Sequence, residues 1–303
     1  MLTLTSGVLL LCAATPFVDA IRPALLAPVQ SLGRLWLLLA LLGVVLAVIA
    51  RAWGATVTFV VAAILPLVTL VSFQGGGCTP GTTRLTVMSI NAELAQASVD
   101  QIVAEAERRD PDVLVDVEVT EPMIEQLLAG GLDEELQYRT PGPVADNGAS
   151  GTVIISRYAM DPVDAAQVAV AHEQPAVRLD VDGRAVTFRA IHTMPPVEGS
   201  LAHWRDGLRE IGDWQSAYRG RPLILAGDFN ASAAHAPYRD AKRGLTDAAG
   251  RWAPATWPAD RAYPPFADID HVLTRGFTAL DSGTFEVDGT DHLGVWADLA
   301  QCR

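Results

Sequence analysis

Charged side chains are nearly missing from the first 83 residues of this 303-residue chain. This stretch carries only Asp19, Arg22, Arg34 and Arg51, whereas the rest of the chain carries 19 basic and 34 acidic residues, a net charge of −15. The contrast excludes a single uniform globular protein. It predicts an apolar segment followed by an acidic domain of about 220 residues, long enough for one large hydrophobic core. A domain this acidic repels phosphate backbones, which argues against a simple nucleic-acid binder.

Apolar runs within residues 1–73 predict a membrane anchor of about three transmembrane helices. A span needs about 20 apolar residues, and the arginine stems at both ends of the middle run can reach the lipid headgroups. The first run is the weakest because Pro16 interrupts it. A signal peptide is an alternative for that first run, and interfacial or buried helices are alternatives for the apolar runs. The predicted spans lie near residues 2–20, 35–52 and 55–73.

The arginines and the cysteines give opposite indications of the side of the membrane on which the acidic domain lies. With three spans, Arg22 and Arg34 lie on the same side as the domain, which slightly favours a cytoplasmic location. Cys78 and Cys302, however, bracket the whole domain. If they pair, the domain belongs in an oxidising, extracytoplasmic compartment, and if they are free thiols it does not need to. The residues alone leave both alternatives open.

Residues 84–303 predict a mixed α+β (α/β) domain after a Gly-, Pro- and Thr-rich linker at 74–83. Apolar runs bounded by turn residues predict strands, of which two are joined by the hairpin signal Asp182-Gly183. Other strands alternate with amphipathic stretches, so we expect two packed sheets with helices outside. The predicted strands are 85–90, 113–119, 152–156, 177–181, 185–191, 223–226, 270–274 and 294–299, and the predicted helices are 99–109, 121–128 and 201–218.

Polar side chains follow one buried strand after another. Asp228 and Asn230 come directly after the strand 223–226, and in an extended chain their side chains would point the same way. Glu118 is a carboxylate near the end of an apolar strand, where it is costly unless it is paired or bound to a metal. Such residues at strand ends predict a site at the edge of the two sheets. The others are Asn91, Glu93, His192, Asp270, Asp291 and His292.

These stretches together resemble the endonuclease/exonuclease/phosphatase superfamily, which includes DNase I. The matching motifs are SINAE, LVDVEV, SGTVIISRY, AIHTMPP, LAGDFNAS, FADIDHVLT and GTDHLGVWADL, in the family's order, over about residues 84–300. The resemblance implies a four-layer αββα sandwich whose first and last strands lie together. That arrangement supports a disulfide between Cys78 and Cys302.

The resemblance also implies catalytic roles, residue by residue. Asp228 matches the residue that orients or deprotonates the attacking water, and Asn230 matches the asparagine that holds the phosphate. His192 matches the phosphate-contacting histidine of the DNase-like members. His292 matches the terminal histidine that stabilises the phosphorane or the leaving oxygen, and Asp270 matches its partner.

Metal binding is assigned in the same way. Glu118 matches the metal-binding glutamate and Asp291 a metal-side carboxylate. Asn91 and Glu93 match the polar pair after the first strand, with Asn91 contacting the substrate and Glu93 binding metal, although the family often has Asp at the second position. Hard oxygen ligands without a Cys/His cluster favour Mg²⁺ or Mn²⁺.

The remaining histidines and tryptophans are interpreted as structural. We expect His172, His203 and His235 on the surface or in loops, and Trp204 and Trp214 in the core rather than on a base-stacking platform.

The substrate is inferred from the membrane anchor and from the charge. The acidic domain has a single lysine, Lys242, and no basic stripe for nucleic acid. A membrane-tethered domain most naturally meets a lipid phosphate, and the layout resembles bacterial membrane-anchored members of the teicoplanin-resistance VanJ type. That resemblance implies an extracytoplasmic domain on a multi-pass anchor in the cell membrane, acting on a polyprenyl (pyro)phosphate-like lipid. The alternatives are a nuclease, a phospholipid phosphodiesterase and a non-catalytic binding protein. No protein partner is predictable.

Overall fold

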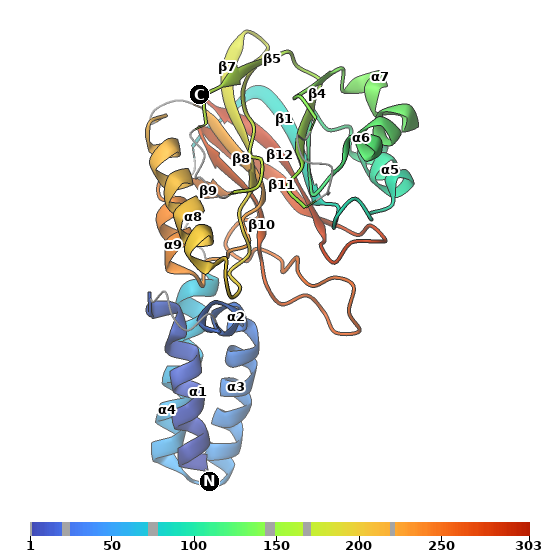
Figure 1. The fold of residues 1–303 in the computed structure, drawn as a ribbon. Coiled ribbons are helices and arrows are strands. Elements are labelled where there is room, and N and C mark those ends of the chain that lie inside the picture. Colours follow the sequence, from blue (N-terminus) through green and yellow to red (C-terminus); the bar gives the residue numbers. More distant parts are fainter. Residues whose placement is uncertain (1, 20–24, 72–77, 143–148, 166–170, 219–221) are drawn as a thin grey trace.

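The computed structural model describes residues 2–19, 25–71, 78–142, 149–165, 171–218 and 222–303. A bundle of apolar helices lies at one end of the molecule, and two β-sheets flanked by helices lie at the other (Figure 1).

The bundle consists of α1 (Leu2–Ala14), α3 (Gly33–Ile49) and α4 (Trp53–Leu70), with the short helix α2 (Leu26–Ser31) at the end nearest the sheets. Small residues line its interior, and a Cβ atom on Gly43 would come within 2.5 Å of the Phe59 ring. Close packing through small residues is typical of membrane helices.

Only part of the expectation of three spans is met. Within the described residues, α4 alone has the length and apolar character to cross a membrane. Helices α1 and α3 are also apolar but shorter. A 3₁₀ turn that contains Pro16 follows α1, and Arg51, with a left-handed φ of 52°, follows the end of α3.

Sheet A contains both chain ends of the domain, and its strands run in the order β11-β12-β1-β2-β4-β3. Strands β1 and β12 are antiparallel neighbours, with Pro80 opposite Cys302, and β1 is parallel to β2. Cys78 and Cys302 form a disulfide at the end of this strand pair, with their Cα atoms 5.6 Å apart. The strands are β1 (Pro80–Asn91), β2 (Val113–Val117), β3 (Tyr138–Arg139), β4 (Thr152–Ser156), β11 (Phe277–Phe285) and β12 (Gly294–Cys302).

Sheet B has the order β5-β6-β7-β8-β10-β9. Strands β6 and β7 form the hairpin predicted at Asp182-Gly183, and β7 is parallel to β8. Strand β10 runs antiparallel to β8, which places Asp270 opposite Asp228. The strands are β5 (Met160–Val163), β6 (Ala176–Val181), β7 (Arg184–His192), β8 (Leu223–Asp228), β9 (Thr246–Asp247) and β10 (Asp270–Arg275).

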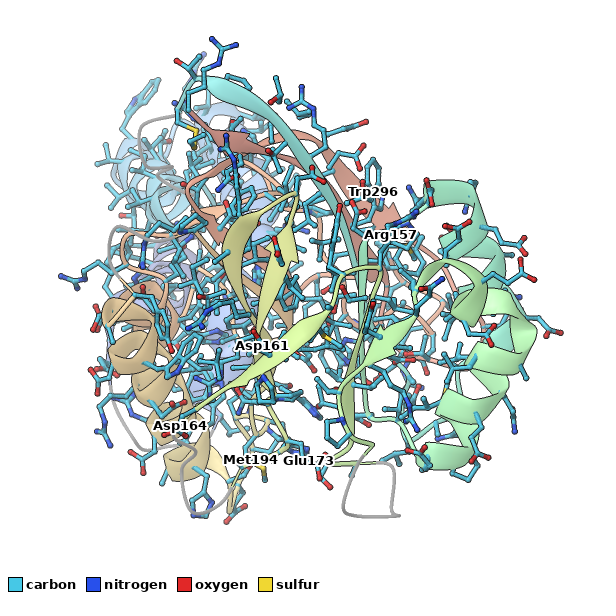
Figure 2. All side chains as sticks on the ribbon, turned by 90° about the horizontal axis from the view of Figure 1, so that it is seen from above. Arg157, Asp161, Asp164, Glu173, Met194 and Trp296 are labelled. Carbon is cyan, nitrogen blue, oxygen red and sulfur yellow. A yellow bond between two sulfur atoms is a disulfide. The ribbon has the colours of Figure 1, made fainter. Side chains whose placement is uncertain are left out.

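The two sheets pack face to face, and helices cover their outer faces. Side chains fill the space between the sheets, and the two groups of helices lie at opposite sides (Figure 2). Sheet A is covered by α5 (Val99–Arg109), α6 (Glu121–Leu127), a π-helical turn at Leu128–Leu132 and α7 (Asp133–Glu135). Sheet B is covered by α8 (Leu201–Ser216) and α9 (Ala236–Ala241), and Trp204 and Trp214 are buried beneath them.

Each predicted strand and helix of the domain is present, but several short or polar elements were missed. Strand β11 was missed because Asp281, Ser282 and Gly283 interrupt its apolar residues, so it shows no apolar alternation. Strand β5 contains Pro162, which an edge strand tolerates. Strand β1 begins at Pro80, within the segment interpreted as a linker. Strands β3 and β9 and helix α9 were also missed.

Candidate active site

Strands from both sheets end at one place, and their last residues face one another. In sheet B, His192 and Asp270 are the direct neighbours of Asp228 in the strand register. From sheet A, Asn91 at the end of β1 donates an amide hydrogen bond to Asp228 Oδ2 at 3.1 Å. The same Asn91 Nδ2 lies 3.1 Å from Glu118 Oε1, just beyond β2. The edge of the sandwich therefore gathers the strand-end residues that the sequence singled out.

Asp228 is the centre of this cluster and is 1% exposed. Its Oδ1 accepts the Asn230 backbone N–H at 2.7 Å, and its Oδ2 lies 3.2 Å from the Asn230 amide nitrogen. Burial and the charge of Asp270 raise the pKa of Asp228 to about 6, against the opposing charges of His292 and His192. At neutral pH this carboxylate is mainly ionised, yet it stays basic enough to accept a proton.

Asp228 and Asn230 come together through a turn, so the expectation of an extended chain was wrong. Asn230 has a left-handed φ of 46°, and its amide also donates to the Thr193 carbonyl at 2.9 Å. The two side-chain amide hydrogens of Asn230 thus bond to Asp228 and to the end of the neighbouring strand. Gly227 has a φ of 140°, and a Cβ there would lie 2.0 Å from the Ile191 carbonyl oxygen. Glycine is required at this position to bring β8 against β7.

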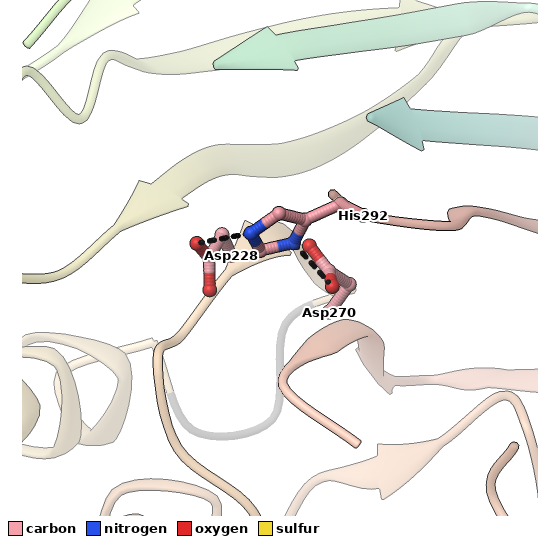
Figure 3. Close-up of side chains that lie close together, drawn as sticks. All are labelled: Asp228, Asp270 and His292. Atoms are coloured by element: carbon pink, nitrogen blue, oxygen red, sulfur yellow. Dashed lines mark hydrogen bonds and ion pairs between the residues drawn. The ribbon is translucent and has the colours of Figure 1, made fainter. Parts of the chain in front are cut away.

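His292 lies between two aspartates (Figure 3). Its Nδ1 donates to Asp270 Oδ2 at 2.9 Å, and its Nε2 lies 3.9 Å from Asp228 Oδ2 and 3.6 Å from Asp291 Oδ1. Burial would lower the pKa of His292. The charge and hydrogen bond of Asp270, with the charges of Asp228 and Asp291, outweigh burial and raise it to about 10. His292 is therefore a buried cation at neutral pH.

Glu118 leaves the strand in a left-handed conformation, with a φ of 59°. Its Oε2 accepts the Leu94 N–H at 3.0 Å, and its Oε1 lies 3.5 Å from His192 Nε2. Burial alone would raise the pKa of Glu118, but His192, Asn91 and Leu94 stabilise the carboxylate and lower the pKa to about 2. Asp116, on the preceding strand β2, is 0% exposed, and its carboxyl has no hydrogen-bond partner within the described part of the chain.

Glu93 and Asp291 hold the loop before β12 against the loop after β1. Glu93 Oε2 accepts the Asp291 N–H at 2.6 Å, and Asp291 Oδ2 accepts the Trp257 indole N–H at 2.7 Å. Burial and the nearby charge of Asp291 raise the pKa of Glu93. Trp257 has no counterpart among the sequence-based expectations, because a lone tryptophan in a Pro-rich loop carries no chemical signal.

The carboxylate oxygens of the site fit a hard divalent cation. Asp228 and Asp270, predicted to be catalytic, form with His292 a cluster whose nearest ligand atoms lie within 4.8 Å of one another. As an imidazolium, His292 has no free nitrogen lone pair, so the oxygens are the available donors. Five carboxylates crowd the cluster against two imidazoles, and their repulsion favours a bound cation. Oxygen donors of this kind suit Mg²⁺ or Mn²⁺. The carboxylates belong to Glu93, Glu118, Asp228, Asp270 and Asp291.

Two histidines expected on the surface or in loops have other roles. His235 lies in a loop, just before α9, as expected, but its side chain is 1% exposed. His172 lies in a loop as expected, but its ring centroid is 3.9 Å from that of His192. Burial and the neighbouring charge of His192 lower the pKa of His172 to about 4, which keeps it neutral beside the site. Only the folded chain brings it there, because 19 residues separate the two.

Comparisons with known proteins agree with this geometry. Residues 88–292 match the model of the Endonuclease/Exonuclease/phosphatase family. No curated protein matches the chain.

Solved structures share the fold over about three quarters of the chain. A humanised TDP2 of D. rerio covers 73% of this chain with 100% of its own, at 14% identity and a TM-score of 0.58. An endonuclease/exonuclease/phosphatase of Beutenbergia cavernae covers 73% with 72% of its own, at 22% identity and a TM-score of 0.55. Sphingomyelinase C of Streptomyces griseocarneus covers 72% with 99% of its own, at 19% identity and a TM-score of 0.52.

Proposed function

Because the chain belongs to the endonuclease/exonuclease/phosphatase family of metal-dependent hydrolases, we propose that it cleaves a phosphate ester or pyrophosphate of a membrane lipid. The observation that carries this proposal is the pairing of a buried basic carboxylate, Asp228, with a buried imidazolium, His292, at one sheet edge. An acid and a base with separated pKa values are what hydrolysis requires.

The chain's own residues supply the proton transfers and the orientation. Asn91 and Asn230 fix the Asp228 carboxylate, which orients a water molecule and accepts its proton as that water attacks phosphorus in line with the leaving oxygen. Within the described residues, His292 Nε2 has no acceptor at hydrogen-bond distance, so it can donate to the phosphoryl or leaving oxygen. Asp270 keeps that imidazole charged and oriented.

The remaining residues of the site hold the substrate and the cation. Glu118, with Glu93 and Asp291, would hold Mg²⁺ or Mn²⁺, and Asn91 and His192 would contact the phosphate. When bound, the cation polarises the phosphoryl group and offsets its charge. Asn230 contributes to phosphate binding only if its amide gives up one of its two present acceptors.

The proposed membrane anchor is supported by the outer surface of the bundle. Large apolar side chains point outward on all three helices, including Leu11, Leu38 and Val57, at 72%, 65% and 65% exposure. An apolar surface of this extent is not stable in water. Shortness of α1 and α3 does not oppose insertion, because helix ends can be completed by snorkelling arginines and local thinning of the bilayer.

The proposed lipid substrate and outward orientation follow from charge and the disulfide. The acidic domain is poorly suited to nucleic acid, whereas a membrane-held domain has lipid phosphates beside it. The Cys78–Cys302 disulfide supports an oxidising compartment over the weak indication from the arginines. We therefore place the domain on the extracytoplasmic face of the cell membrane, as in the VanJ type.

The test is Mg²⁺-dependent phosphate release from a polyprenyl pyrophosphate by the detergent-purified full chain. Asp228→Asn and Glu118→Gln serve as matched variants of equal size. We expect release by the wild type and a loss of at least about 100-fold in each variant. If wild type and variants release phosphate equally slowly, lipid pyrophosphatase activity is refuted. Phospholipid and plasmid cleavage, measured with the same variants, then decide between a phospholipid phosphodiesterase and a nuclease.

A further inference from the structure

The loop that follows the catalytic strand β8 rests directly on helix α2 of the bundle. His235 Nδ1 accepts the Ser232 N–H at 2.9 Å, so its Nε2 carries the proton and donates to the Ala27 carbonyl of α2 at 3.1 Å. Ala27 itself is buried in the same apolar cluster as Phe229 and Ala231, the neighbours of the catalytic residues. The active-site end of the domain is therefore the end that faces the bundle.

Arginine contacts fix this orientation at three further points. Arg239 donates to the Pro16 carbonyl at 2.8 Å, beyond the end of α1. Arg205 of α8 pairs with Asp19. Arg34, in the first turn of α3, donates to the Ala253 carbonyl in the segment between β9 and β10. A domain held at several points over the bundle keeps one edge toward the bilayer.

The segment 251–266 lies at the level where α3 enters the bundle, since Arg34 binds it there. In Figure 1 the chain between β9 and β10 reaches down to the level of α2. Trp252 is 61% exposed and Tyr263 is 53% exposed, and arginines 251 and 261 are exposed beside them. Exposed tryptophan, tyrosine and arginine together are typical of side chains in the headgroup region.

The same segment also reaches the active site. Trp257 donates to Asp291 Oδ2 at 2.7 Å, and the Ala259 N–H donates to the Asp291 carbonyl at 2.7 Å. Trp257 lies five residues after Trp252 in the chain. The segment therefore also forms part of the surroundings of His292. The exposed segment that carries Trp252 is therefore continuous with one side of the site.

We propose that segment 251–266 rests in the headgroup region of the bilayer that holds the helices, and that the active site takes its lipid phosphate from that same membrane. This inference rests on the proposed function, and it names the lipid of the enzyme's own bilayer as the substrate source. Trp252 and Tyr263 act as interfacial anchors that hold the open edge of the site against the leaflet.

The first experiment measures the depth of Trp252 in phosphatidylcholine vesicles that hold the full chain. Lipids brominated near the headgroup quench nearby tryptophans, and the difference in quenching between wild type and Trp252→Phe isolates Trp252. We expect the wild type to lose more fluorescence than Trp252→Phe. Equal quenching of the two proteins would overturn the proposal.

The second experiment separates lipid access from chemistry. Wild type, Trp252→Ala/Tyr263→Ala and the control Tyr138→Ala, whose side chain is 44% exposed on β3, are each assayed on two substrates. Polyprenyl pyrophosphate is placed either in the enzyme's own vesicles or in separate protein-free vesicles, and bis(p-nitrophenyl) phosphate is supplied in solution. We expect release mainly from the enzyme's own vesicles, at least about fivefold slower in the double variant, with the soluble ester unaffected.

Each outcome is assigned to one proposal. Equal lipid turnover by the double variant and Tyr138→Ala, or equal turnover of lipid in separate vesicles, contradicts the interfacial inference while leaving the hydrolase intact. Absence of Mg²⁺-dependent turnover of every substrate contradicts the proposed function, and the quenching difference then still decides where segment 251–266 lies.

Discussion

Asp270→Asn tests whether the charge of His292 drives the reaction. The substitution keeps the size of the side chain and removes a charge that lies 2.9 Å from His292 Nδ1. The pKa of His292 is about 10 instead of an ordinary 6.5, a stabilisation of the cation on the order of 5 kcal/mol. Burial opposes that rise, and Asp270 is its main cause, so its loss is expected to lower the pKa by roughly 1 to 3 units.

The pH profile of kcat/KM then shifts in a direction that a purely structural role would not give. The cation of His292 persists in the wild type to about pH 10, so its profile stays level through pH 9. In Asp270→Asn the cation is lost from roughly pH 7 to 9, and the rate at pH 9 falls between about twofold and 100-fold. The acidic limb also moves down, because the charge of Asp270 helps to raise the pKa of Asp228 to about 6.

The assay follows hydrolysis of bis(p-nitrophenyl) phosphate from pH 5 to 9 at saturating Mg²⁺. Asp247→Asn is the matched control, because Asp247 pairs with His271 at the same 2.9 Å distance, in a buried position outside the site. Its profile should keep the acidic limb of the wild type and stay level up to pH 9. An Asp270→Asn enzyme that is uniformly slower at every pH, with the acidic limb unmoved and no fall toward pH 9, would refute the argument.

Three further predictions concern stability, measured on the full chain in detergent. Burial raises the pKa of Asp116 well above its value in the unfolded chain, so the free energy of unfolding falls as pH rises above about 4. Asp116→Asn should remove this loss. The difference in free energy of unfolding between variant and wild type should grow by about 1.4 kcal/mol per pH unit until the folded carboxyl ionises. Denaturant unfolding at several pH values checks this, and a constant difference would contradict it. Cys302→Ser should cost about 2–5 kcal/mol, because the disulfide closes a loop with a sequence separation of 224, and dithiothreitol should destabilise the wild type but not the variant. Gly227→Ala should cost about 2–4 kcal/mol because of its φ of 140° and the clash with Ile191, and an unchanged thermal midpoint would show that β8 can move away from β7.

The location of the site was predictable from the sequence, and the family resemblance also gave the Asp270–His292 pair, but the other contacts were not predictable. Apolar runs ending in Asn91, Glu118, His192 and Asp228 indicate strand ends, and strand ends of neighbouring strands meet at one edge. Which groups pair across that edge depends on register between strands far apart in the chain. Two Asp-His pairs of equal length formed, His271 with Asp247 and His292 with Asp270, and no local pattern distinguishes the catalytic candidate from the structural pair.

The contact between the domain and the helical bundle was also not predictable from the sequence. His235 lies in a stretch of small residues, where a histidine is ordinarily exposed, but it is buried against Trp204 and α2. Burial lowers the pKa of His235 to about 4, so it remains neutral and donates one hydrogen bond to Ala27. Its partner lies 208 residues away, between the first two predicted spans. The helical bundle is therefore also part of the support of the loop that follows β8.

The rule of alternating side chains failed at the site for a physical reason. Left-handed φ angles occur at Glu93, Leu94, Ala95, Glu118 and Asn230, each of which costs about 1–3 kcal/mol when the residue is not glycine. Hydrogen bonds to buried acceptors offset that cost: the N–H groups of Leu94 and Asn230 donate to the carboxylates of Glu118 and Asp228, and that of Glu93 donates to Asn91 Oδ1. An extended chain would aim these side chains to alternate faces of the sheet, and the carboxylates would lose their donors. The backbone leaves the strand at these residues, and that departure brings the carboxylates of the two sheets, on Glu118 and Asp228, together at Asn91.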